Sequence, residues 1–177
     1  MNKIFAVILF LIALPVAAYG YSVDWDKNLD YSIETGNTPH AGMWYNNKTG
    51  ISATFNTTYQ TFQFFDLTPS GHEHLVGFTY LGKGILRCDV PGEYHVLWEA
   101  LGKGVQGHEY RGVIFINETM YNRTEWLAVG QASTIVSMHG VGFINIGKGS
   151  NVTLRIADTS GSATGTAYIG NVNLIRI

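Results

Sequence analysis

The chain has a single cysteine, Cys88, in 177 residues, so no disulfide can form within it. Charged residues make up only 14% of the sequence, well below the about 25% of an average soluble protein. The 11 Lys and Arg residues form no cluster or stripe. Because nucleic-acid binding needs a basic footprint, we expect no nucleic-acid partner.

Long apolar runs are missing beyond the first 20 residues, and so are long segments with helical periodicity. Those 20 residues have one cation, Lys3, an apolar run over 4–14 and then small residues. This layout predicts a secretory signal peptide at 1–20, because a membrane span needs about 20 apolar residues. If the leader stays uncleaved, it would instead hold the chain at a membrane. Without Lys3, 10 basic side chains face 13 acidic ones.

N-glycosylation motifs, in contrast, are frequent for a chain of this length. Five Asn-x-Thr sequons without a central proline begin at Asn47, Asn56, Asn117, Asn122 and Asn151. Behind a leader, they favour a glycoprotein that is secreted, or carried on a cell surface or a virion. The alternative for any one site is that Asn and Thr simply populate turns and exposed strand faces.

Short alternating segments and 21 glycines replace the missing helices. After the turn signal Pro91-Gly92, alternation puts Tyr94, Val96 and Trp98 on one face of a strand and Leu97 on the other. On a second strand, we expect Val113 and Phe115 to be core anchors and Ile114 and Ile116 to point the opposite way. Strands recur about every ten residues, which predicts an all-β sandwich or barrel.

Three segments in order resemble a known family. They are Gly84–Ala100 (GILRCDVPGEYHVLWEA), Val113–Met120 (VIFINETM) and Gly142–Ala157 (GFINIGKGSNVTLRIA). This series is similar to the C1q/TNF-like jelly roll over 54–177. Two departures are Glu118, where the family has Gly after Asn, and Gly149-Ser150-Asn151, where it has Gly-Asp.

The resemblance implies a two-sheet antiparallel jelly roll of ten strands that assembles as a homotrimer. We expect a polar N-terminal arm and first strand at 21–50 and the jelly-roll domain at 51–177. Outward-facing apolar residues would make the contact between copies, although each of them could equally be ordinary core. The candidates are Leu97, Ile114, Ile116, Tyr168 and Leu174, with Ile177 as a further option.

Chemistry-bearing patterns are weak. His72 and His74 share a strand face and are metal candidates, but a zinc site needs three or four converging ligands. The few clustered carboxylates allow calcium only as a remote option, and we expect no other cofactor. No nucleophile elbow is present, and nothing marks a pair among Glu93, Glu99, Glu109 and Glu125 as buried, so an enzyme is not expected.

The sequence therefore predicts an exported, glycosylated, trimer-forming jelly roll that acts by binding or assembly, with a cell-surface or glycan ligand as an option. One alternative is a structural subunit of a virion, surface layer or filament that uses its N-terminal arm for strand addition. Another is a carbohydrate-binding module with Trp44 and Trp126 as sugar contacts. For Cys88, we expect a buried, inert thiol; the alternative is a disulfide between copies.

Overall fold

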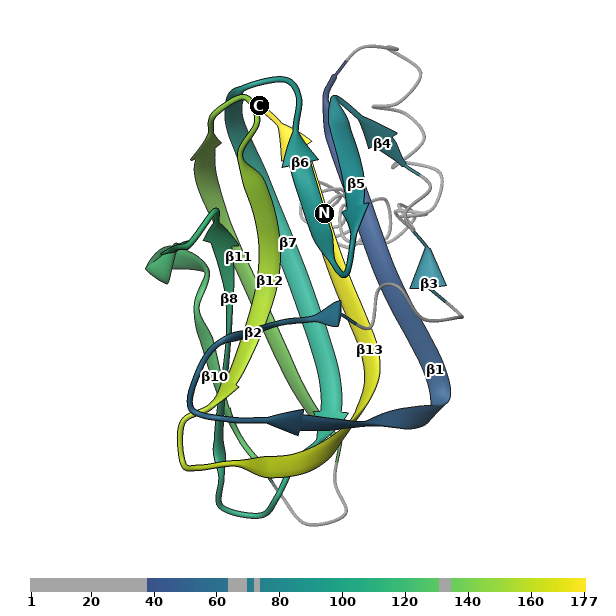
Figure 1. Ribbon diagram of the computed structural model, residues 1–177, viewed down its shortest axis with the longest axis vertical. Helices are drawn as coiled ribbons and strands as arrows, with labels where there is room; N and C mark the ends of the chain where they lie inside the picture. Colours follow the sequence, from purple (N-terminus) through teal and green to yellow (C-terminus); the bar gives the residue numbers. More distant parts are fainter. Residues whose placement is uncertain (1–37, 64–69, 72–73, 131–134) are drawn as a thin grey trace, which may run out of the picture. The chain divides into compact units, whose positions relative to one another are not determined.

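The computed structural model describes residues 38–63, 70–71, 74–130 and 135–177, which form an antiparallel β-sandwich (Figure 1). The expected signal peptide and most of the polar arm lie outside the described residues. The elements are β1 (His40–Phe55), β2 (Gln60–Thr61), β3 (Ser70–Gly71), β4 (Leu75–Val76), β5 (Phe78–Gly82), β6 (Ile85–Cys88), β7 (Gly92–Lys103), β8 (Glu109–Ile116), β9 (Thr119–Met120), the 3-10 turn η2 (Asn122–Thr124), β10 (Trp126–Val129), β11 (Val136–Ile146), β12 (Asn151–Asp158) and β13 (Ala163–Arg176).

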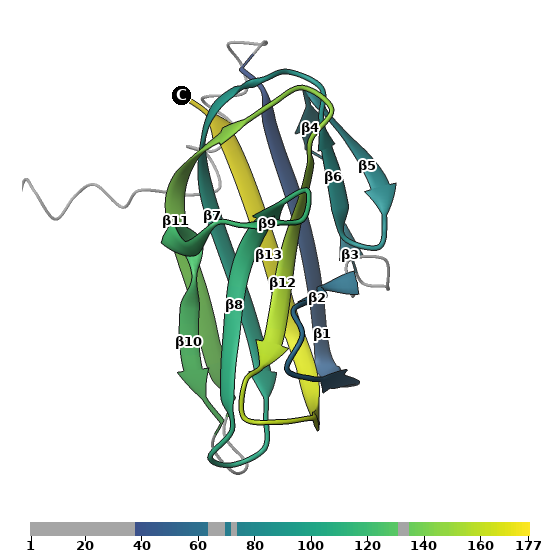
Figure 2. The ribbon, with the colours of Figure 1, turned by 60° about the vertical axis from the view of Figure 1, so that its left-hand side comes forward.

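The strands form two sheets. The first has the order β11-β7-β13-β1-β3, with β4 also paired to β1. The second has the order β10-β8-β12-β6-β5, with β2 paired to β12 and β9 paired to β8. In Figures 1 and 2, β8 and β12 of the second sheet lie over β7 and β13 of the first. This arrangement confirms the all-β architecture predicted from strand spacing and the two-sheet antiparallel sandwich that the family resemblance implies.

The core lies between the sheets and follows strand alternation. On β7, the side chains of Tyr94, Val96 and Trp98 have no exposed surface. On β13, Val172 and Leu174 are equally buried, because they pair in register with the β7 residues Trp98 and Val96. Burying each large apolar side chain stabilises the fold by about 1.5–3 kcal/mol.

Strand β8 differs from the prediction, because it is buried on both faces. Ile114 is fully buried in the core between the sheets, and Ile116 is half-buried and packs against that core. Val113 and Phe115 are also buried, but they point to the outer side of the second sheet. There the guanidinium of Arg155 covers the Phe115 ring at 4.3 Å, and the Tyr59 ring lies 5.5 Å from it.

The η2 turn closes the sandwich beside β8 and β11. The buried Thr124 hydroxyl accepts a hydrogen bond from the Ile114 amide (3.0 Å) and donates one to the Tyr121 carbonyl (2.9 Å). The Thr124 carbonyl accepts the indole N–H of Trp98 (2.8 Å). One threonine thus joins η2 to both sheets and leaves the buried Trp98 nitrogen satisfied.

Strand β1 extends further toward the N-terminus than expected. It runs from His40 to Phe55 and pairs with β13 along its length, with a register shift between Asn46 and Ile51. The expected boundary between residues 50 and 51 therefore falls inside this strand. Within the described residues, no helix is long and apolar enough to span a membrane.

Candidate functional site

The outer face of the first sheet exposes large apolar side chains from two adjacent strands. Leu97 on β7 pairs with Val141 on β11, and the next outward pair is His95 with Phe143. Leu97, Val141 and Phe143 are 47%, 53% and 56% exposed. We call these three residues, with the neighbouring half-buried Ile175 of β13, the apolar patch. Exposed apolar side chains that lie side by side mark interaction sites more often than scattered ones do.

Polar residues surround the apolar patch on the same face. Toward the middle of the sheet, the Asn173 amide donates to the Asn171 side-chain oxygen (3.0 Å). Next to the Leu97–Val141 pair on this face, Glu99 of β7 pairs with His139 of β11. An apolar centre with a polar rim is the usual composition of a protein–protein interface.

Of the residues predicted to contact a second copy, only Leu97 is strongly exposed and inside the apolar patch. Ile114 and Leu174 are fully buried within the single chain, so they cannot contact a partner, and Ile116 packs against the core. These three predictions are corrected: strand alternation directs all three side chains between the sheets. Tyr168 is half-buried, with its ring beside Gly50.

The two tryptophans predicted to contact sugar lie in different sheets. Trp44 is half-buried on β1 of the first sheet, and Trp126 belongs to β10, an edge strand of the second sheet. Trp126 is exposed at the start of β10, and His139 stacks on its ring with centroids 4.3 Å apart. The structure therefore does not bring the pair together, and carbohydrate binding stays a prediction.

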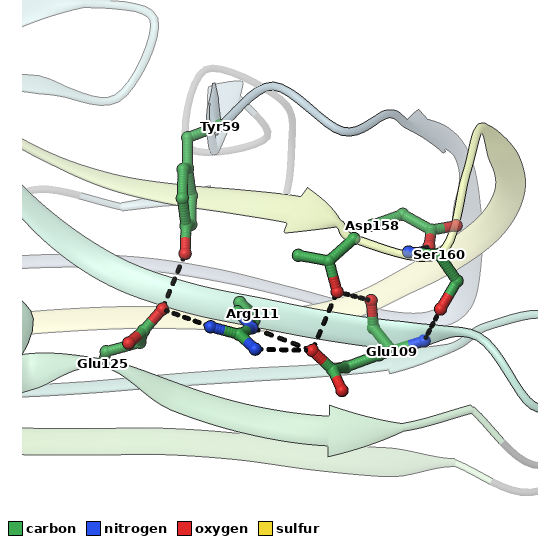
Figure 3. Close-up of polar contacts among 7 residues, drawn as sticks. Tyr59, Glu109, Arg111, Glu125, Asp158 and Ser160 are labelled. Atoms are coloured by element: carbon green, nitrogen blue, oxygen red, sulfur yellow. Dashed lines mark hydrogen bonds and ion pairs between the residues drawn. The ribbon is translucent and has the colours of Figure 1, made fainter.

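A ladder of charged groups crosses the outer face of the second sheet (Figure 3). Arg111 of β8 lies between Glu109, at 2.8 Å, and Glu125, at 3.5 Å. The Tyr59 hydroxyl donates to Glu125 (2.7 Å), and the Thr159 hydroxyl donates to Glu109 (2.9 Å). These contacts join β8 to the segments before β2 and β10 and to the loop after β12.

The charged ladder links these segments, and contacts within the chain engage both of its carboxylates. The Thr159 hydrogen bond and Arg111 hold the pKa of Glu109 below its usual range. Burial and the hydrogen bond to Glu125 raise the pKa of Tyr59 to about 12. Arg111 contacts both Glu109 and Glu125, so neither carboxylate is a free general acid or base.

A second polar pair sits at the end of β12. The side chain of Asp158 is fully buried and contacts the imidazole Nδ1 of His108 at 2.8 Å. Its other oxygen accepts the Ser160 amide at 3.1 Å. These contacts tie the end of β12 to the segment before β8 and to the following loop.

The metal prediction is not supported in the part of the chain that the structure describes. No group of three His, Cys, Asp or Glu side chains there is placed to hold a metal ion. His74 is exposed, and His72 lies outside the described residues.

Cys88 is buried with no exposed surface beside the Pro91-Gly92 turn. Its thiol donates to the Val90 carbonyl at 3.0 Å, and burial raises its pKa. A thiol that is buried and protonated is a poor nucleophile. A disulfide between copies would require the fold to open, which leaves the inert structural thiol as the remaining alternative.

An apolar cavity of about 40 Å³ lies at one end of the sandwich. Phe55, Phe62, Tyr110 and Met138 are among the side chains that line it. The lining is almost entirely apolar, and no cluster of charged side chains faces it within the described residues.

The predicted glycan sites differ in exposure. Asn117 and Asn122 are exposed, whereas Asn56 and Asn151 are half-buried, and Asn47 lies within β1. Asn117 occupies the left-handed region with φ 55° in the turn between β8 and β9, a conformation that asparagine tolerates better than most residues. Asn56, Asn117, Asn122 and Asn151 all lie away from the outer face of the first sheet.

Sequence reasoning missed Val141 and Phe143. On β11, the core-facing positions include Gly140 and Gly142, whereas the larger Val141 and Phe143 point outward, so apolar alternation does not mark the core face there. The reason is that Trp98 fills the space above Gly140, and a Cβ there would collide with its indole nitrogen. The core face of β11 can therefore be recognised only from the pairing with β7, whose Trp98 occupies the volume on that side.

The fold and these surfaces define a β-jelly roll with an apolar sheet face. More specifically, the chain has the C1q/TNF-like fold, as comparison with solved structures shows. No protein-family model matches the chain, and no curated protein matches it.

Three solved structures illustrate the similarity. The Eiger TNF of S. frugiperda matches with a TM-score of 0.58 and 10% identity, over 80% of this chain and 93% of that one. The PRD1 vertex protein P5 matches with a TM-score of 0.56 and 14% identity, over 80% and 99%. The globular domain of zebrafish complement 1qA matches with a TM-score of 0.52 and 14% identity, over 78% and 96%. At these identities the likeness concerns the fold alone.

Proposed function

We propose that this protein is an exported, N-glycosylated homotrimer that acts through its surface, by recognition or assembly, and that its copies associate through the apolar patch. The observation that carries the proposal is the in-register exposure of Leu97, Val141 and Phe143 on adjacent strands. Burying these side chains against a second copy removes apolar surface from water, at about 25 cal/mol per Å².

The distribution of glycan sites supports a second copy as the occupant of this face. Four of the five sequon asparagines lie off the outer face of the first sheet, so glycans on them would leave the apolar patch accessible. The C1q/TNF-like fold supports the trimer, because the family resemblance implies that assembly state. Binding in place of catalysis is supported by the carboxylates of the charged ladder, which are engaged by Arg111.

A structural role in a virion is the alternative that a specific observation favours. The PRD1 vertex protein P5 has the same fold and nearly its whole length is matched. In this alternative, the polar arm at 21–40 would add a strand to a neighbouring copy. The two functions differ in the size of the assembly, since strand addition between successive copies builds open polymers.

Sedimentation velocity of the full chain from a eukaryotic secretory host, at pH 8, tests the proposal. The wild type should sediment as a discrete trimer. Leu97→Asp should weaken association by at least about thirtyfold, the effect of losing about 2 kcal/mol at an interface hot spot. Val129→Asp is the matched control, because Val129 is 49% exposed but lies on the outer face of the second sheet.

A monomeric wild type, or equal effects of Leu97→Asp and Val129→Asp, would contradict the proposed interface. A distribution of large polymers would instead support the structural alternative. Thermal unfolding of both variants checks that the fold is intact, since both substitutions replace side chains that are exposed in the single chain.

A further inference from the structure

Three histidines lie on the same outer face as the apolar patch. His95 on β7 pairs with Phe143 of the apolar patch, and His139 on β11 lies one outward position beyond Val141. His40, the first residue of β1, pairs with Ile175 of β13. Imidazole is the side chain that gains a charge between about pH 7 and pH 5. Burying a histidine-bearing face between copies therefore costs more free energy of desolvation at pH 5, where imidazole is charged, than at pH 7.

His95 is enclosed by apolar neighbours. Its ring lies 5.1 Å from the Phe143 ring of β11, and Ile175 of β13 pairs with it on the other side. On β7 itself, Leu97 is the next residue on this face in one direction and the exposed Glu93 in the other. Arg176 of β13 lies against Gly92 beyond this position. Neither adjacent strand places a carboxylate opposite His95.

His139 has the opposite surroundings. The indole of Trp126 stacks on its ring, and Glu99 lies opposite it on β7. His40 contacts the Thr38 carbonyl through Nδ1 at 2.8 Å and lies between Ile175 and Val76 at the start of β1.

We propose that the assembly is acid-sensitive and that His95 is the residue responsible. This inference rests on the proposed association through the apolar patch. When copies associate, the neutral His95 is buried with Phe143, Leu97 and Ile175. Protonation places a charge in that apolar contact, where both adjacent strands pair apolar residues with His95 and the nearest carboxylate of its own strand, Glu93, points to solvent. Burying such a charge is costly.

The sign and steepness follow from proton linkage. The free subunit binds the His95 proton more readily than the assembly does, so association is favoured at higher pH and is lost as pH falls. A trimer excludes up to one proton for each of its copies. Its association constant therefore falls by up to about a thousandfold for each pH unit below the imidazole titration.

Sedimentation velocity at pH 8.0, 6.5 and 5.0 tests the inference on the full chain. The wild type should be trimeric at pH 8.0 and mostly monomeric at pH 5.0. His95→Phe keeps an aromatic ring against Phe143 and cannot be charged, so it should remain trimeric at pH 5.0. His139→Gln is the matched control and should dissociate in acid as the wild type does. Circular dichroism at each pH checks that the subunits remain folded.

The outcomes separate this inference from the proposal beneath it. A wild type that is monomeric at pH 8.0 overturns the proposed association, and the inference with it. A wild type that is trimeric at both pH 8.0 and pH 5.0 overturns the inference and leaves the association standing. Acid dissociation that persists in His95→Phe, or that is lost in His139→Gln, overturns the assignment to His95.

Discussion

Trp98 holds the two sheets at their observed separation. Its ring fills the space above Gly112 of β8 in the opposite sheet and above Gly140 of β11 in its own sheet. A Cβ added at Gly112 would lie 2.5 Å from the Trp98 ring, and one at Gly140 would collide with the indole nitrogen. The two glycines are needed because the tryptophan leaves no volume for a side chain.

We therefore expect Gly112→Ala and Gly140→Ala each to destabilise the protein by about 1–3 kcal/mol through overpacking. This corresponds to a fall of about 2–12 °C in the midpoint of thermal unfolding. Gly147→Ala is the control, because the nearest atom to an added Cβ there is the Ser150 hydroxyl at 3.4 Å. Calorimetry in which Gly112→Ala unfolds at the wild-type midpoint would show that Trp98 adapts to the methyl group.

Residue-level predictability depends on how many faces of a strand are covered. Alternation predicted the buried side of β7, because Leu97 on its other face is exposed. It could not separate inside from outside on β8, because Arg155 and Tyr59 come from distant parts of the chain to cover Phe115. The charged ladder was unpredictable for the same reason: its members are spread over about a hundred residues of sequence.

At the scale of elements, η2 is a connection between sheets made by one buried hydroxyl. Thr124→Val keeps the side-chain volume but leaves the Ile114 amide without its acceptor, and an unsatisfied buried donor costs about 1–3 kcal/mol. Thr124→Ser retains the hydroxyl and should cost less. We expect this order in urea unfolding midpoints.

Glycosylation has to be separated from this effect. Thr124 is the third residue of the sequon at Asn122, so Thr124→Val also removes a predicted glycan site, whereas Thr124→Ser keeps it. Asn122→Gln removes the site and leaves the Thr124 hydroxyl in place. If Asn122→Gln destabilises the protein as much as Thr124→Val does, the glycan and not the hydrogen bond stabilises η2.

An all-β sandwich or barrel was predictable because turns and strand alternation are local signals, and the resemblance to the C1q/TNF-like family implied the two-sheet jelly roll. The register that builds the apolar patch was not, because it depends on pairing across β11, β7 and β13. Leu97 was identified from the alternation of its own strand, whereas the exposure of Phe143 beside His95 follows only from the pairing of β11 with β7. A sequence shows that a strand has two faces, and its partners decide which face stays exposed.

At the scale of the whole molecule, folding and assembly respond to different pH ranges. Three carboxylates have a pKa held below the usual range by folded-state contacts. These contacts are the Thr79 hydrogen bond and Arg87 for Asp89, the Thr159 hydrogen bond and Arg111 for Glu109, and Arg155 for Glu118. Each contributes stability above its unfolded pKa of about 4, and that stability is lost as pH falls through the lower folded value.

Groups whose pKa is raised by folding set the opposite limit. Burial raises the pKa of the Cys88 thiol, so the unfolded chain loses this proton first as pH rises above about 8.5, and stability falls from there. The pKa of the Tyr59 phenol is raised to about 12, and its contribution is lost in turn above about pH 10. Thermal unfolding of Leu97→Asp, in which association no longer adds to stability, should therefore give a midpoint that is nearly constant from about pH 5 to pH 8 and lower on both sides. Glu118→Gln should reduce the fall of the unfolding midpoint at acid pH, because the ion pair with Arg155 is lost. Glu93→Gln, which changes an exposed carboxylate on β7, should leave that fall unchanged.

Unfolding midpoints that fall steeply between pH 7 and pH 5 would contradict this plateau and would mean that acid acts on the fold itself. With the plateau in place, dissociation over that interval is a property of the sheet face that carries His95, since the subunits remain folded while they separate.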